Sequence, residues 1–180
     1  GWVERHAFGL VRRGVLIRQR LDETGAAIAV DAAGPGCMFP IDPARHSGAS
    51  VACDYAATDL IVCLCPVRVV DDVLNESSTV GRDLLALQAY ALDRVERLAQ
   101  SRGARNTRKR VASLLKVLSE TLSPSRVRDR LPPGLQQRDM AKLLGIRHES
   151  FCRALRELEQ DGVIVREPSG IAIVQRAGLG

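Results

Sequence analysis

The chain has 180 residues, enough for one large or two small domains, and its composition is that of a soluble globular protein. Hydrophobic residues make up 46% and charged residues 26%, and no apolar run approaches the roughly 18 to 20 residues of a membrane-spanning helix. Because there is no secretory signal sequence either, we expect a cytoplasmic protein with no membrane partner.

Charge is divided unevenly along the chain. Residues 1–75 hold seven Lys or Arg against nine Asp or Glu, a net charge of −2, whereas residues 76–180 hold 19 against 12, a net charge of +7. Since Lys and Arg supply most of the non-specific affinity for nucleic acid, the C-terminal part is the one expected to meet a polyanion. A solvated basic surface is the alternative.

The first part of the chain has a β pattern that extends to about Val70. Short apolar runs such as "GVLIRQRL" and "TDLIVCLC" are separated by the turn signals "DETG", "AAGPG" and "DPARHSG". This pattern predicts a small barrel or sandwich. The chain starts without Met and enters a predicted strand almost at once, so we expect this domain to lack an N-terminal piece.

A long helix is predicted next, over residues 79–102, with Ser77 or Ser78 as its N-cap. Its apolar residues recur at a spacing of seven, so they form one stripe along the helix. Such a stripe packs on its own domain or pairs with a second copy, and we expect a homodimer seam. The seam residues are Leu84, Leu85, Ala91, Leu92, Val95 and Leu98.

The remaining chain predicts a helix-turn-helix followed by a hairpin. A helix within residues 104–122 has basic residues first and an apolar face behind them. A short helix over residues 138–144 ends at Gly145, which suits a tight turn because it has no Cβ, and a second helix covers residues 148–160. Two short β runs then flank Pro168-Ser169-Gly170.

The start of the second motif helix has side chains suited to reading bases. His148, Glu149, Cys152 and Arg153 are predicted to face outward there. Arginine can hold guanine O6 and N7 together, and a carboxylate can accept from cytosine N4. Glu149 and Arg153 are also four residues apart, so a solvated surface ion pair is the alternative.

These motifs resemble the Crp/Fnr family of transcription regulators over nearly the whole chain. "RDMAKLLGIRHESFCRALRELEQDGVI" followed by "IAIV" is similar to the winged helix-turn-helix of that family, and "VRRGVLIRQRLDETGAAIAVDAAGPGCMF" is similar to its β-roll. The resemblance implies an α+β fold: a cyclic-nucleotide-binding-like jelly roll in residues 1–75, a dimerisation helix in 76–103 and a winged helix-turn-helix in 104–180.

The resemblance also implies roles for individual residues. Glu149 and Arg153 match the family's base-reading "E-S/T-x-x-R" pattern, and we expect His148, Ser150 and Cys152 to adjust the choice of base. The residues expected to contact DNA phosphate are Gln136, Gln137, Arg138 and Arg147.

The sensor region departs from the cyclic-nucleotide type. Members of the family that bind cyclic nucleotides carry a Gly-Glu-Leu stretch and a later Arg-Ser/Thr pair, which hold the ribose and the phosphate. In this chain the glutamate is missing after Pro35-Gly36, and Arg45, the one arginine that could meet a phosphate, is at a position that does not match the pair. Burying a cyclic phosphate without cationic partners is costly, so cyclic AMP is not expected.

Cysteines are dense in this region instead. "LIVCLCPVRVVDDVL" is similar to the oxygen-sensing Fnr type, in which Cys63 matches one iron–sulfur ligand. Cys63 and Cys65 alternate along a strand and so share a face, and thiolates suit iron–sulfur, zinc or copper(I). The candidate sensor or metal-binding thiols are Cys63, Cys65, Cys37 and Cys53. Inert core cysteines beside a small-molecule site in the roll remain the alternative.

Together these features predict a homodimeric regulator on a palindromic double-stranded DNA operator, with RNA polymerase as a further partner. No nucleophile–base set, phosphate loop or metal-protease motif is found, so an enzyme is not expected. A module whose winged helix meets protein instead of DNA is the remaining alternative.

Overall fold

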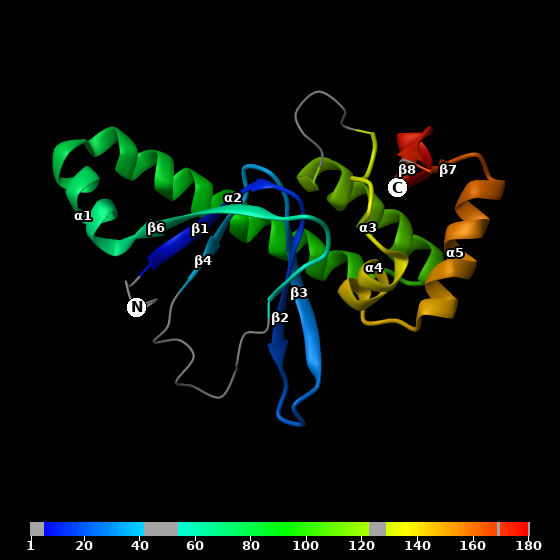
Figure 1. Ribbon diagram of the computed structural model, residues 1–180. Coiled ribbons are helices and arrows are strands. Elements are labelled where there is room, and N and C mark those ends of the chain that lie inside the picture. Colours follow the sequence, from blue (N-terminus) through cyan, green and yellow to red (C-terminus); the bar gives the residue numbers. More distant parts are fainter. Residues whose placement is uncertain (1–5, 42–53, 123–128, 169, 180) are drawn as a thin grey trace.

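The computed structural model describes residues 6–41, 54–122, 129–168 and 170–179. Within these ranges an N-terminal β domain is followed by a long helix and a C-terminal helical domain (Figure 1). No helix there combines the length and apolarity needed to cross a membrane. The expected positions of Arg45 and Cys53 lie outside the described residues.

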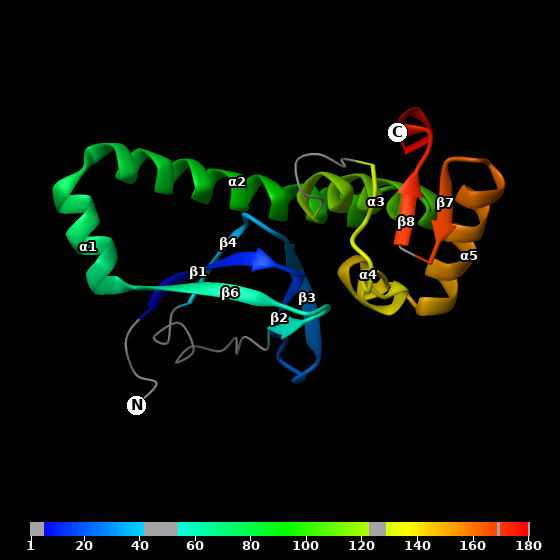
Figure 2. The ribbon, with the colours of Figure 1, turned by 45° about the horizontal axis from the view of Figure 1, so that its top comes forward.

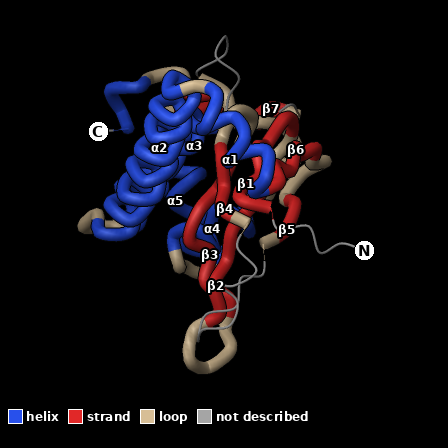
Figure 3. The backbone as a smooth tube through the Cα atoms, turned by 90° about the vertical axis from the view of Figure 1, so that its left-hand side faces the viewer, coloured by secondary structure: helices blue, strands red, loops and turns tan. Residues whose placement is uncertain are grey.

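The β domain consists of two antiparallel sheets of three strands each (Figure 3). One sheet has the order β4-β1-β6 and the other β3-β2-β5. The turn signal "DETG" forms the β2–β3 connection, where the Asp22 carboxylate accepts the N–H groups of Thr24 and Ala26 at 2.8 and 2.9 Å. The strands are β1 (His6–Arg13), β2 (Leu16–Leu21), β3 (Ala27–Ala33), β4 (Met38–Pro40), β5 (Tyr55–Ala56) and β6 (Ile61–Pro66).

A ten-residue helix follows β6 where the sequence pattern indicated strand as far as Val70. Helix α1 (Val67–Glu76) turns the chain back toward the start of α2 (Ser78–Gly103; Figure 2). The valines of α1 favour strands by intrinsic preference, but Val70, Val73 and Leu74 have the spacing of one helix face. None of the α1 residues is buried, so this amphipathic spacing rather than core packing accompanies the helix, and the expectation of a strand to Val70 was wrong.

The long helix α2 has 26 residues and agrees with the predicted range within two residues. Ser77 occupies its N-cap position, although the Ser77 side chain makes no capping hydrogen bond. Arg94 in the middle of α2 donates two hydrogen bonds to Asp31 on β3, at 2.8 and 2.7 Å, and both side chains are almost fully buried. This ion pair attaches α2 to the β domain.

The C-terminal domain has the predicted helices and hairpin. The apolar face of α3 is buried at Val111, Leu114, Leu115 and Leu118. The elements are α3 (Thr107–Leu122), α4 (Gln137–Leu144), α5 (His148–Gln160), β7 (Ile164–Glu167), β8 (Gly170–Ile173) and a terminal 3-10 helix (Arg176–Leu179).

One hydrophobic core joins both domains. Val15, Ile17, Ala29 and Ala32 of the β domain belong to the same buried cluster as the apolar residues of α3, α4, α5 and the hairpin. A smaller second cluster lies within the β domain. At the β3–β4 turn, a Cβ on Gly34 would lie 2.8 Å from the Leu122 Cα, so glycine allows this turn to contact the end of α3. The two domains therefore pack as one body.

Candidate nucleic-acid interface

The helix-turn-helix is built around Gly145. This residue ends α4 in the left-handed region, with φ of 64°, and its N–H bonds to the Lys142 carbonyl at 3.1 Å. The N–H of Ile146 bonds to the Ala141 carbonyl at 3.2 Å, which closes a Schellman-type end. Helix α5 then packs its apolar side inward and leaves its other side free. The buried residues of α5 are Phe151, Ala154, Leu155 and Leu158.

The outward side of α5 presents charged groups to the solvent. Glu149, Arg153 and Arg156 are exposed, and no ion pair joins Glu149 to Arg153 in the described part of the chain. The alternative of a surface bridge between these two residues therefore does not hold. His148 is also exposed, and Ser150 is half-buried. Both charged groups are available to an external partner.

Cys152 lies between the two motif helices. Its thiol donates to Gln137 Oε1 at 3.1 Å, and its sulfur is 3.3 Å from His148 Nε2. Gln137 is half-buried in this contact, whereas Gln136 and Arg138 beside it are exposed. Among the residues expected to contact phosphate, the exposed ones are Gln136, Arg138 and Arg147. Gln137 is partly exposed, and its side chain also bonds to Cys152 of α5.

The hairpin is tied to α5 by an ion pair. Arg166 on β7 donates through Nε to Glu159 at 2.8 Å, and this contact holds the pKa of the Glu159 carboxyl below its ordinary value. Arg130, ahead of α4, pairs with Glu167 at 2.8 Å. The β7–β8 hairpin, here called the wing, is therefore fixed to the C-terminal half of α5, away from the residues expected to read bases.

Tyr55 on β5 connects the β domain to the first motif helix. Its hydroxyl donates to Asp139 Oδ1 on α4 at 2.8 Å, and the Lys142 ammonium lies 5.2 Å from the centre of its ring. Burial and the Asp139 carboxylate both raise the pKa of the Tyr55 hydroxyl. Asp139 is 4% exposed, so this hydrogen bond satisfies a buried carboxylate.

Arg102 makes a second connection, at the end of α2. Its Nε donates to the Leu143 carbonyl of α4 at 2.8 Å, and its Nη2 donates to the Ala29 carbonyl of β3 at 2.5 Å. Burial lowers the pKa of this guanidinium. A single side chain thus links the long helix, the β domain and the end of α4.

The candidate sensor thiols differ in their exposure to solvent. Cys63 is exposed and Cys65 half-buried on one face of β6, as their alternation predicts. Cys37 is buried instead, with its sulfur 3.9 Å from the Thr121 carbonyl of α3, and burial raises the pKa of its thiol. Its role as a sensor thiol stays a prediction, and the structure places it inside the β domain against the end of α3.

The described residues do not supply a complete iron–sulfur site. Such a cluster is typically held by about four cysteine thiolates. Within the described ranges, no group of three or more His, Cys, Asp or Glu side chains is close enough to hold a metal ion. Cys63 and Cys65 together offer two thiols at one place.

The residues of the expected dimer seam on α2 differ in exposure. Leu98 is 1% exposed and lies in the chain's own core, so this structure does not offer it to a second copy. Leu85 and Leu92 are 71% and 60% exposed, and they are also seven residues apart. The half-buried members of the expected set are Leu84, Ala91 and Val95.

Some residues of this interface could have been found from the sequence, and others could not. Arg156 follows Arg153 by three residues, a spacing that places both on one side of a helix. Tyr55 and Arg102 contact partners 84 and 41 positions away, which no local pattern marks.

Comparison with known proteins agrees with this architecture. The family model of the Crp-like helix-turn-helix domain matches residues 109–180. The transcriptional activator protein FnrL of Cereibacter sphaeroides is 28% identical over 146 residues, which cover 77% of this chain. The chain spans 59% of the length of that relative.

Solved structures extend the likeness to the whole fold. The structure of FixK2 from Bradyrhizobium japonicum has a TM-score of 0.77 at 23% identity and covers 98% of this chain and 87% of its own. A Crp/Fnr-family transcriptional regulator from Thermus thermophilus has a TM-score of 0.62 at 25% identity, over 98% and 87% of the two chains. The chain therefore contains a Crp-like helix-turn-helix domain at residues 109–180, and its β domain, long helix and helix-turn-helix follow in the same order as in these solved structures.

Proposed function

We propose that this protein is a sequence-specific DNA-binding transcription regulator that acts as a homodimer on a palindromic operator. The observation that carries the proposal is the pair of exposed charges of Glu149 and Arg153 at the start of α5, which do not pair with each other. A helix in this position of a helix-turn-helix enters the major groove with its N-terminal residues against the base edges. Such a regulator acts in the cytoplasm, with RNA polymerase as its further partner.

The two charged groups suit a G·C pair. The Arg153 guanidinium can donate to O6 and N7 of a guanine, and the Glu149 carboxylate can accept from N4 of a cytosine. His148, Ser150 and Cys152 border this pair on the same helix and would adjust the neighbouring bases. Gln136, Arg138 and Arg147 would hold phosphates and set the register of α5 in the groove.

Dimerisation would follow from the outward stripe of α2. Leu85 and Leu92 are large apolar side chains left in solvent at heptad spacing, and pairing with the same stripe of a second copy would bury both. Two copies related by a twofold axis would place their α5 helices about 34 to 36 Å apart, which is one turn of DNA.

For the controlling signal, we propose a redox, oxygen or metal change acting at Cys63, with Cys65 beside it. Cys63 is an exposed thiol on the outer face of β6, whereas Cys37 is buried with a raised pKa and is poorly suited to form a thiolate. An iron–sulfur cluster or a thiolate-bound metal would need ligands besides these two thiols. A small molecule in the β domain is the alternative signal.

The DNA-reading role is tested with Arg153→Ala. The change removes a bidentate base contact, so we expect a loss of about 1 to 3 kcal/mol on the selected operator with weak random-DNA binding unchanged. Operators selected from a random pool are titrated by fluorescence anisotropy. Arg12→Ala, an exposed arginine on β1, is the matched control and should bind as the native protein does.

Two results would contradict this role. One is an equal loss of affinity on operator and random DNA, which would make Arg153 a phosphate contact. The other is a binding affinity that hardly changes with salt, because phosphate contacts make protein–DNA affinity fall steeply as salt rises. The second result would favour a protein partner for the winged helix.

The sensor role is tested with Cys63→Ser. Operator affinity of the native protein should change by about tenfold between anaerobic and air-exposed samples, within the usual range of coupling between sites. Cys63→Ser should abolish this change, and Cys152→Ser should keep it. If instead Cys152→Ser alone removes the response, the signal acts at the reading helix and the β-domain proposal fails.

A further inference from the structure

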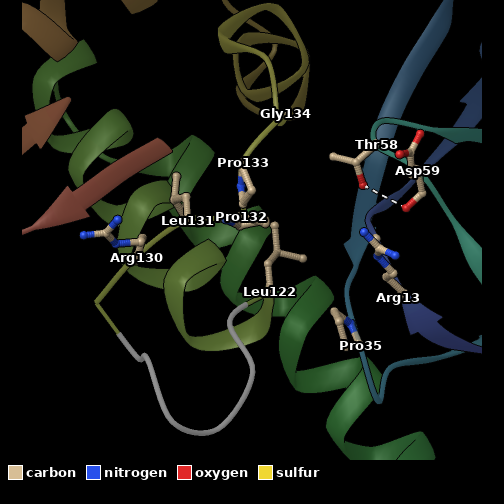
Figure 4. Close-up of a pocket in the computed structure, with 11 residues that line it drawn as sticks. Arg13, Pro35, Thr58, Asp59, Leu122, Arg130, Leu131, Pro132, Pro133 and Gly134 are labelled. Atoms are coloured by element: carbon tan, nitrogen blue, oxygen red, sulfur yellow. Dashed lines mark hydrogen bonds between the residues drawn. The ribbon is translucent and has the colours of Figure 1, made fainter. Parts of the chain in front are cut away.

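A cleft of about 690 Å³ lies between the β domain and the segment that leads into α4 (Figure 4). One wall comes from the β1–β2 turn and the loop before β6, with Arg13, Thr58 and Asp59. The opposite wall is formed by residues 130–134. This volume is within the range of small-molecule sites, roughly 300 to 1,000 Å³.

The cleft combines an apolar interior with two opposite charges on one wall. Leu122 and Leu131 are both almost fully buried. They lie beside Pro35 and beside Pro132 and Pro133 of the segment that leads into α4. On the β-domain wall, neither the Arg13 guanidinium nor the Asp59 carboxylate makes an ion pair with a described residue, and the two do not pair with each other. Figure 4 shows both on the same side of the opening.

This charge arrangement selects among ligands. Arg130 on the opposite wall already pairs with Glu167, so Arg13 and Asp59 decide the choice. A simple anion would meet Arg13 but be repelled by Asp59, and a simple cation would be repelled by Arg13. A zwitterion satisfies both, because its carboxylate can accept from the guanidinium while its ammonium donates to the carboxylate. We propose that the cleft binds a free amino acid with a large apolar side chain, whose side chain lies against Leu122 and Leu131.

The position of the cleft would make this ligand an effector. Thr58 is three residues from Tyr55, the residue that bonds to Asp139 of α4, and Gly134 is three residues before α4 begins. A Cβ on Gly134 would lie 3.4 Å from the Thr58 methyl carbon, so the two walls are separated there by little more than one side-chain carbon. A bound amino acid would contact both walls and so affect the placement of the first motif helix.

The binding test uses three probes that differ in one charge. The full chain is titrated by calorimetry with L-phenylalanine, 3-phenylpropionate, which lacks the ammonium, and 2-phenylethylamine, which lacks the carboxylate. L-Phenylalanine should bind about tenfold more tightly than either analogue, since each analogue loses one charge-assisted hydrogen bond. L-Leucine and L-tryptophan are titrated in parallel to find the preferred side chain.

Variants locate the site. Arg13→Gln should weaken amino-acid binding about tenfold, and Arg12→Gln, its exposed neighbour, should not. Asp59→Asn should remove the preference for L-phenylalanine over 3-phenylpropionate. The proposal is overturned if none of the amino acids binds at millimolar concentration, if the three probes bind equally, or if Arg13→Gln and Arg12→Gln behave alike.

Operator affinity with and without the amino acid gives a separate measurement. This part rests on the proposed DNA-binding function, and a change in affinity that Arg13→Gln abolishes would support the effector role. Amino-acid binding without any effect on DNA would overturn the effector role and keep the site. Failure of DNA binding itself leaves the calorimetric result standing, so the two proposals fail separately.

Discussion

At the scale of single residues, the cysteines of this chain differ in burial and in the groups that they contact. Cys63 is exposed on β6, Cys152 donates to Gln137 between the motif helices, and Cys37 is buried against α3. The alternation of Cys63 and Cys65 was enough to place them on one face of a strand. The burial of Cys37 depends on Thr121, which lies 84 positions away, and no local pattern carries that information.

Tyr55 gives a prediction at this scale. Tyr55→Phe removes the hydrogen bond to Asp139 and leaves a buried carboxylate with the Lys142 ammonium 4.0 Å away. We expect the free energy of unfolding to fall by about 1 to 3 kcal/mol, measured by urea denaturation. Tyr90→Phe is the matched control, because Tyr90 is 45% exposed on α2, and it should change stability little.

The same hydroxyl predicts a dependence on alkaline pH. Burial and Asp139 raise the pKa of Tyr55 above its ordinary value of 10.0, so the folded state keeps the proton that the unfolded state loses above pH 10. This contribution to stability is therefore complete below pH 10 and declines above it. Tyr55→Phe should show a shallower alkaline loss of stability than the native chain, and identical slopes would contradict the linkage.

At the scale of elements, periodicity predicted most of the C-terminal domain. The ranges of α4 and α5 and the left-handed Gly145 follow from apolar spacing and the absence of a Cβ. Helix α1 was missed because its β-branched residues have strand preference, although Val70, Val73 and Leu74 have the spacing of one helix face. The sequence did not show that Leu98 of the α2 stripe is buried in the chain's own core, since periodicity finds a repeat without saying which face meets that core.

The stripe gives a prediction for the dimer. Leu92→Glu places two like charges in the proposed seam, so the dimer should dissociate at micromolar concentration. Sedimentation equilibrium measures the mass, and circular dichroism checks the fold. Val174→Glu is the control, since Val174 is 59% exposed against 60% for Leu92 but lies beside the wing. A native protein that is monomeric would contradict the seam outright.

At the scale of the whole molecule, the domains are mechanically one unit. The buried cluster that contains Val15 and Ile17 also contains Leu115, Phe151 and Ile171. Arg102 and the Arg94–Asp31 pair add polar ties between the same parts. Domain order was predictable from the sequence, but this joint core was not, because it depends on contacts between distant segments.

The joint core predicts cooperative unfolding. Calorimetry of the chain should show a single transition in which the β domain and the helix-turn-helix unfold together, with equal calorimetric and van't Hoff enthalpies. Two separate transitions would contradict the joint core. Leu115→Ala, which leaves a cavity in the joint cluster, should lower the one transition as a whole without splitting it.

The shared core also bears on how the chain is made. A ribosome adds about 5 to 20 residues per second, so the segment from Val15 to Ala32, which carries the β-domain part of the cluster, emerges several seconds before α5 and the hairpin that complete it. During that interval the apolar face of the nascent sheet is exposed to solvent. The nascent protein is therefore a natural client for chaperones at the tunnel exit, and ribosomes stalled between α2 and α3 should hold a sheet that proteases cut readily.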